Sequence, residues 1–182
     1  MKHLANIVTV SRAPIGVAIA LLIQNPSKTN LVLCLVLAVI AEMTDFLDGT
    51  IARKLNAVSA IGKALDPLCD SLYRAAVFMG MAVAGWMSLP LLFIFIFRDT
   101  IVSYARIFAA QAGVDVAARI SGKLKAILQA VAQIGVLVIA YLSVDNLNIA
   151  GHHLAQILIY VAAAVTFYSA IDYAYNLTKN PS

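Results

Sequence analysis

Six apolar runs, each long enough to cross a lipid bilayer, constrain the fold of this chain more than any other feature. They lie near residues 7–24, 30–52, 61–86, 89–111, 123–144 and 153–177. A helix of ~20 residues crosses the ~30 Å hydrocarbon core of a bilayer. Of the 182 residues, 62% are hydrophobic and only 12% are charged, which is more apolar than soluble domains usually are. We therefore predict a single all-α integral membrane domain, residues 1–182, folded as a six-transmembrane-helix bundle.

The basic residues predict how this bundle is oriented. Six spans place both termini on one side of the membrane, and most basic residues near the span ends fall on that side, against Lys28 on the other. These residues are Lys2, Arg12, Arg53, Lys54, Lys63, Arg119, Lys123, Lys125 and Lys179. The positive-inside rule makes that side cytoplasmic. The net charge of +4 then reflects topology and anionic lipid headgroups, and nothing indicates a nucleic-acid partner. We expect the two cysteines, Cys34 and Cys69, to be packed inside separate spans.

Four aspartates interrupt the second and third apolar runs. Asp45 and Asp48 are spaced i, i+3, and Asp66 and Asp70 are spaced i, i+4, so each pair projects from one helix face. An ionisable side chain inside a bilayer costs a few kcal/mol or more and usually marks a functional site. The short connection between the two runs predicts an antiparallel hairpin, in which the pairs face each other roughly 10 Å deep on the cytoplasmic side.

This arrangement of acids predicts bound divalent cations. Four carboxylates held together repel one another, and two divalent ions would cancel their charge. Oxygen donors without Cys or His favour Mg²⁺, Mn²⁺ or Ca²⁺. Two such ions ~4 Å apart can clamp a phosphate during phosphoryl transfer. Glu42 lies one turn before Asp45, where it either supports these ligands or makes a polar packing contact, and both interpretations stay open.

Small residues on the same faces leave room for a ligand. Gly49, Ala52 and Gly62 remove side-chain bulk, which allows either close helix packing or a ligand lying against the backbone. Arg53 has a guanidinium suited to phosphate oxygens, although on its own it is equally an ordinary flank of a membrane span. Together with the four acids, these residues favour a site for metals and a phosphate-bearing ligand.

Residues 45–70 read DFLDGTIAR, then eight residues, then GKALDPLCD. This segment resembles the signature of the CDP-alcohol phosphatidyltransferases. The resemblance implies the six-helix fold of that family, a homodimer, and transfer of a phosphatidyl group from a CDP-linked lipid such as CDP-diacylglycerol to an alcohol, with release of CMP. It also implies that Asp45, Asp48, Asp66 and Asp70 hold two Mg²⁺ or Mn²⁺ ions, that Asp70 serves as general base, and that Gly49, Arg53 and Ser59 contact the CDP portion.

Further segments resemble the family members that use glycerol 3-phosphate and make phosphatidylglycerophosphate. The stretch from Asn6 through Thr9 to Arg12 resembles one that borders the nucleotide in those members, although Asn6 as a helix cap and Arg12 reaching toward headgroups are equally open. Leu65-Asp66-Pro67 and the segments 98–106 and 122–129 also resemble them. We expect the acceptor phosphate to contact basic residues from the second half of the chain and one from the third span: Arg98, Arg106, Arg119, Lys123, Lys125 and Arg74.

Three departures from that subgroup leave other acceptors open. Ser71 stands where a basic residue usually follows the last aspartate, with Arg74 one turn later; Asp99 replaces a Glu, and Cys69 an Ala. The acceptor is then alternatively an inositol phosphate, or phosphatidylglycerol as in a cardiolipin synthase, and the basic residues alternatively only set topology. A divalent-cation transporter is a hypothesis of another class, but the acids lie on one side of the membrane and the chain has no visible internal repeat.

Overall fold

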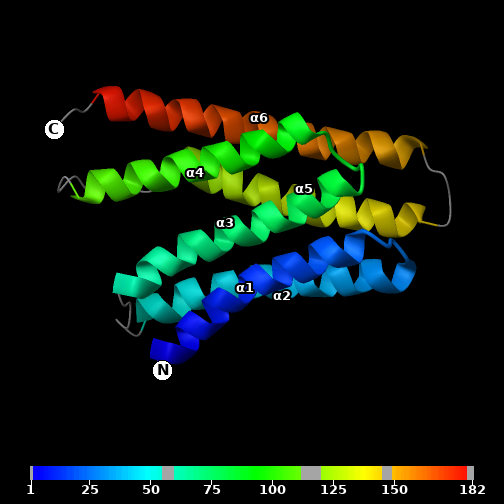
Figure 1. The fold of residues 1–182 in the computed structure, drawn as a ribbon, viewed down its shortest axis with the longest axis horizontal. Coiled ribbons are helices and arrows are strands. Elements are labelled where there is room, and N and C mark those ends of the chain that lie inside the picture. The colour runs from blue at the N-terminus through cyan, green and yellow to red at the C-terminus, as the bar shows by residue number, and fades with distance from the viewer. Residues whose placement is uncertain (1, 55–59, 112–119, 145–148, 180–182) are drawn as a thin grey trace.

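The computed structural model describes the backbone of residues 2–54, 60–111, 120–144 and 149–179, and the side chains of residues 9–44, 67–105, 120–144 and 151–175. Over these ranges the chain forms six helices and no strand, which confirms the predicted all-α six-helix bundle. They are α1 (Lys2–Ile23), α2 (Lys28–Lys54), α3 (Ala60–Val83), α4 (Leu89–Gln111), α5 (Ile120–Ser143) and α6 (Ile149–Lys179). Successive helices run in alternating directions, so the start of α1 and the end of α6 lie at the same end of the bundle (Figure 1).

The helices form a closed ring that does not follow chain order. Going round it, α1 packs on α3, α3 on α4, α4 on α6, α6 on α5, α5 on α2, and α2 on α1. A further contact joins α3 to α5 across the interior. The expected α2–α3 hairpin is antiparallel, but over the described residues α1 packs against both helices and no direct α2–α3 packing is found. The predicted facing of the two acid pairs lies outside the described side chains.

Two glycines explain why α1 takes the place beside α3. A Cβ at Gly80 would lie 2.6 Å from the Ala20 Cα, and one at Gly16 would lie 2.8 Å from the Tyr73 carbonyl oxygen. The backbones of α1 and α3 thus approach too closely for any side chain at these points, as small residues allow in membrane helix pairs. This crossing brings the middle of α1 against the acid-bearing face of α3.

The turn at the end of α3 corrects one predicted boundary. The third span was predicted to reach residue 86, whereas α3 ends at Val83. Gly85 adopts a φ of 76°, and the Trp86 N–H donates to the Met81 carbonyl at 2.8 Å. A left-handed glycine followed by this bond is a common way to end a helix, and apolar composition alone does not reveal it.

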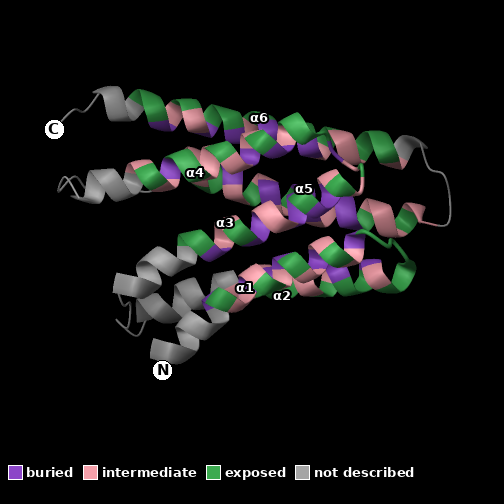
Figure 2. Cartoon of the chain, in the orientation of Figure 1, coloured by how far each residue is buried: buried purple, intermediate pink, exposed green. Residues whose placement is uncertain are grey.

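The bundle has an apolar interior and an apolar exterior. Phe78 and Phe95 stack inside with ring centroids 4.2 Å apart, and Cys34 and Cys69 are buried, as predicted. Large hydrophobic side chains are also exposed along the outer faces of the helices, where Figure 2 shows exposed and buried residues side by side. Among the described residues, Ile120–Ser143 and Gly151–Tyr175 are each long and apolar enough to cross a membrane.

Candidate active site

Asp70 is the one aspartate of the predicted metal-binding set whose side chain the structure describes. It lies on α3, and 29% of its side chain is exposed. The Nε of Arg74 donates to Asp70 Oδ1 at 3.0 Å, and the Nη1 of Arg12 lies 3.8 Å from the same oxygen. Two arginines therefore converge on one oxygen of a carboxylate that is still partly open.

Arg74 is buried at the point where three helices meet. It follows Asp70 by four residues on α3, so the two side chains share a helix face. Its Nη1 donates to the Ala126 carbonyl oxygen on α5 at 2.7 Å, and its Nη2 lies 4.0 Å from Glu42 Oε1 on α2. Its own carbonyl oxygen accepts a bond from Gln133 Nε2 at 3.0 Å. The sequence predicts Arg74 as a contact for the acceptor phosphate, and the structure places its guanidinium among protein partners.

Arg12 reaches the same carboxylate from α1. Only 1% of its side chain is exposed, so the interpretation that it reaches out toward lipid headgroups is wrong. The close crossing at Gly16 and Gly80 holds this part of α1 against α3. Thr9, one turn earlier and predicted to contact the CDP-lipid, is also buried, and its role stays a prediction.

A second charged cluster joins α4, α5 and α6. Asp99 accepts a bond from Arg98 Nη1 at 3.1 Å and from Lys125 Nζ at 2.5 Å, both at Oδ1. Arg98 Nη2 donates to Ser169 Oγ on α6 at 2.7 Å. The three charged side chains are 6% to 12% exposed. Two predicted phosphate contacts, Arg98 and Lys125, are thus brought together around one acid.

The last helix contributes polar residues that the sequence analysis did not single out. Thr166 accepts a bond from Gln129, Ser169 from Arg98, and Asp172 from Ser121 at 2.6 Å. Thr166, Ser169 and Asp172 recur every three residues, so they lie on one face of α6. That spacing within an apolar run is the signal that would have revealed them.

The two clusters meet on α5. Lys125 belongs to the cluster around Asp99, and the next residue, Ala126, accepts the bond from Arg74. Adjacent residues of α5 therefore contact one member of each cluster, Arg74 of the first and Asp99 of the second. Between them the two clusters have the groups needed to accept a proton and to bind an anion.

Many predicted site residues lie outside the described side chains. They include three of the four aspartates and most of the expected CDP contacts: Asp45, Asp48, Asp66, Gly49, Ala52, Arg53, Ser59, Gly62, Asn6, Arg106 and Arg119. Among the described side chains no group of three metal-binding residues occurs, and the predicted metal site stays a prediction. Lys123, also predicted to contact the acceptor, is described and exposed.

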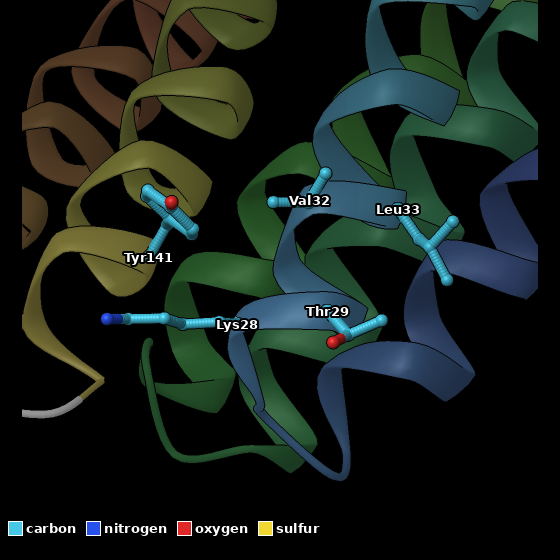
Figure 3. Close-up of a pocket in the computed structure, with 5 residues that line it drawn as sticks. All are labelled: Lys28, Thr29, Val32, Leu33 and Tyr141. Atoms are coloured by element: carbon cyan, nitrogen blue, oxygen red, sulfur yellow. The ribbon is translucent and has the colours of Figure 1, made fainter.

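A shallow hollow of about 320 Å³ lies between the start of α2 and the end of α5 (Figure 3). Its lining consists of Lys28, Thr29, Val32, Leu33 and Tyr141. It contains no carboxylate, and it lies where the sequence predicts the outer membrane face. The hollow is therefore not part of the charged site.

Comparison with known proteins identifies the class. The family model described as CDP-alcohol phosphatidyltransferase matches residues 2–168. The chain belongs to the CDP-alcohol phosphatidyltransferase family, and it is a membrane enzyme of that class.

Among its relatives, the chain is 33% identical over 176 residues to a CDP-diacylglycerol–glycerol-3-phosphate 3-phosphatidyltransferase of Rickettsia typhi, covering 95% of this chain and 96% of that protein. A Bacillus subtilis protein of the same name is 32% identical over 140 residues, 76% of this chain and 69% of that one. One from Mycoplasma genitalium is 41% identical over 91 residues, which are 50% of this chain and 39% of the relative.

Proposed function

We propose that this enzyme transfers the phosphatidyl group of CDP-diacylglycerol to glycerol 3-phosphate and releases CMP. The observation that carries this proposal is that Arg74, the partner of Asp70, contacts Ala126 on α5, directly beside the Lys125 that pairs with Asp99. The proton-accepting group and the phosphate-binding groups of such a reaction must lie close together. The relatives' names support the choice of both substrates.

The residues fit a pair of divalent cations, which we propose as Mg²⁺ or Mn²⁺. The backbone is helical at 45–48 and 66–70, so each aspartate pair shares a face, and carboxylates are the donors these ions prefer. Asp45, Asp48, Asp66 and Asp70 would hold them. When bound, the ions would offset negative charge on the diphosphate of the CDP-lipid.

In the proposed reaction, a hydroxyl oxygen of glycerol 3-phosphate bonds to the lipid-side phosphorus. The bond between that phosphorus and the oxygen bridging to CMP breaks, so CMP leaves with its phosphate. The hydroxyl proton passes to Asp70, the group we propose as general base. Gly49, Arg53 and Ser59 are proposed to hold the CDP portion, with Ala52, Gly62, Asn6 and Thr9 lining its site.

The acceptor phosphate is proposed to bind at Arg98 and Lys125. Two cations share the single carboxylate of Asp99, so this cluster has a surplus positive charge. Guanidinium and ammonium groups in a largely desolvated site bind phosphate strongly. Lys123, Arg106 and Arg119 are proposed to add to this field, on the side of the bundle that we propose faces the cytoplasm.

The acceptor test uses purified enzyme with CDP-diacylglycerol and Mg²⁺, offered glycerol 3-phosphate, inositol phosphate, glycerol or phosphatidylglycerol in turn. We expect CMP release and a phosphatidylglycerophosphate product with glycerol 3-phosphate alone. Chelation with EDTA should abolish release, and Mg²⁺ or Mn²⁺ should restore it. A faster reaction with inositol phosphate or phosphatidylglycerol would replace the proposed acceptor, and CMP release undiminished by EDTA would exclude the metal role.

A further inference from the structure

The carboxylate of Asp70 has one side closed by arginines and one side open. Both of its described ion pairs, with Arg74 and with Arg12, are made at Oδ1. The two arginine side chains are 5% and 1% exposed, whereas that of Asp70 is 29% exposed. Oδ1 therefore points into the protein, and Oδ2 is the oxygen left for groups that enter the site.

Besides its ion pair with Asp70 on the same helix, Arg74 makes contacts with two other helices. Its guanidinium also contacts the Ala126 carbonyl on α5 and lies near Glu42 on α2, and Gln133 binds its own carbonyl oxygen. The nitrogen that binds Asp70 is thus fixed by contacts on two further helices. A planar guanidinium with several fixed hydrogen bonds has little freedom to follow a rotating carboxylate.

We infer that Arg74 is a positioning residue, which holds Oδ1 of Asp70 and thereby directs Oδ2 toward the reacting groups. This inference rests on the proposed function, and it gives Arg74 a different role from the phosphate contact expected from the sequence. A catalytic carboxylate must keep its orientation to within a fraction of an ångström. Groups that orient metal-binding or catalytic side chains typically contribute 10- to 100-fold in activity.

The position of the basic residue on α3 supports this role. The residue directly after Asp70 is Ser71, and the nearest basic residue after it on α3 is Arg74. A neighbour at i+1 points to a different helix face, while one at i+4 shares the face of the aspartate. Arg74 can therefore hold Asp70 from the buried side, which a lysine at position 71 cannot do.

The first test compares the wild type with Arg74→Gln, Arg74→Lys and a control, Gln156→Leu. Gln156 makes the same kind of contact between helices, a side-chain bond to the Trp86 carbonyl at 2.9 Å, but has no tie to Asp70. We expect Arg74→Gln to lower kcat ~10- to 100-fold with the KM for glycerol 3-phosphate changed less than ~3-fold. Arg74→Lys should recover part of kcat, and Gln156→Leu should affect only thermal stability.

A second measurement does not depend on turnover. The electron paramagnetic resonance spectrum of Mn²⁺ added to each detergent-purified variant reports the arrangement of the ligands. We expect an altered spectrum for Arg74→Gln and Arg74→Lys, and the wild-type spectrum for Gln156→Leu. Unchanged spectra in both Arg74 variants would overturn the inference, whether or not the wild type proves active with glycerol 3-phosphate.

Two further variants separate positioning from other roles. In an Asp70→Asn background, Arg74→Gln should lower kcat no further, because its effect acts through that carboxylate. Adding Ser71→Lys to Arg74→Gln should not restore kcat. A raised KM for glycerol 3-phosphate with kcat unchanged in Arg74→Gln would instead assign Arg74 to the acceptor phosphate. Rescue by Ser71→Lys would show that a nearby positive charge is sufficient, and both results would overturn the inference.

Discussion

Two carboxylates in this bundle, Asp70 and Asp99, each receive two cations on a single oxygen, but their surroundings differ. Asp70 is 29% exposed, while its arginines are almost fully buried. Asp99 is 12% exposed, about as shielded as the Arg98 and Lys125 that surround it. In the first cluster, two buried arginines hold a partly exposed acid. In the second, two largely buried cations surround an acid that is itself largely buried.

The two clusters also differ in the balance between their positive and negative charges. Among the described side chains, Arg12 and Arg74 are matched in number by Asp70 and the nearby Glu42, so these four groups together carry no net charge that would attract an anion. Around Asp99 the cations outnumber the acid. The pattern of pairing, and not the number of basic residues, thus separates a cluster suited to proton transfer from one suited to binding phosphate.

The largest effect that we expect is on kcat, and it distinguishes Asp70 from Asp99. Asp70→Asn should lower kcat for CMP release by ~10²- to 10⁴-fold, the range typical for loss of a general base. It should also lower stability, because Arg12 and Arg74 lose their shared acid, but by less than Asp99→Asn, since Glu42 remains beside Arg74. Asp99→Asn leaves two buried cations without their acid, at a cost of about 3 kcal/mol, and should affect kcat far less than Asp70→Asn. CMP release per folded molecule and thermal unfolding in detergent measure the two effects. The comparison fails if both variants lose stability and retain turnover.

The next effect tests the cluster around Asp99 as the phosphate site. Lys125→Met preserves the length of the side chain and removes its charge. A hydrogen bond to a charged group contributes about 1.5–3 kcal/mol, so the KM for glycerol 3-phosphate should rise ~10- to 100-fold. The KM for CDP-diacylglycerol should stay within ~3-fold. Steady-state kinetics in mixed micelles gives both values.

Lys28→Gln is the matched control for that prediction. Lys28 lines the hollow beside Tyr141, near the end of α5 opposite to the one that carries Lys125 (Figure 3). Its loss should leave both KM values at the wild-type level. An equal rise in the KM for glycerol 3-phosphate in both variants would mean that general surface charge, and not the cluster, attracts the acceptor.

The sequence predicts the helices well because each element is a long apolar run bounded by polar residues. The i, i+4 spacing of Asp70 and Arg74 is compatible with their ion pair, although Arg74 was predicted to contact the acceptor phosphate instead. Contacts between helices are not encoded in this way. Arg12 meets Asp70 because glycines let α1 approach α3, and Arg98 meets Ser169 although 71 residues separate them. Both depend on the order of helices around the ring, which composition and periodicity do not determine.

The smallest expected effect compares the helix crossings that support the two clusters. At Gly80 on the α1–α3 crossing, an added Cβ would lie 2.6 Å from the backbone of Ala20, which cannot move aside without shifting a helix. At Gly135 on α5, an added Cβ would lie 2.7 Å from Leu158 Cδ1, the end of a flexible side chain. Overpacking a rigid contact costs about 1–3 kcal/mol.

We therefore expect Gly80→Ala to lower the unfolding temperature in detergent by several degrees, and Gly135→Ala to lower it by less. Because the α1–α3 crossing places Arg12 beside Asp70, Gly80→Ala should also reduce kcat, while Gly135→Ala should leave it unchanged. Equal stability and equal kcat in the two variants would show that the close approach of α1 does not position the first cluster. In that case its geometry would depend on the Arg74 contacts with α5 and α2 alone.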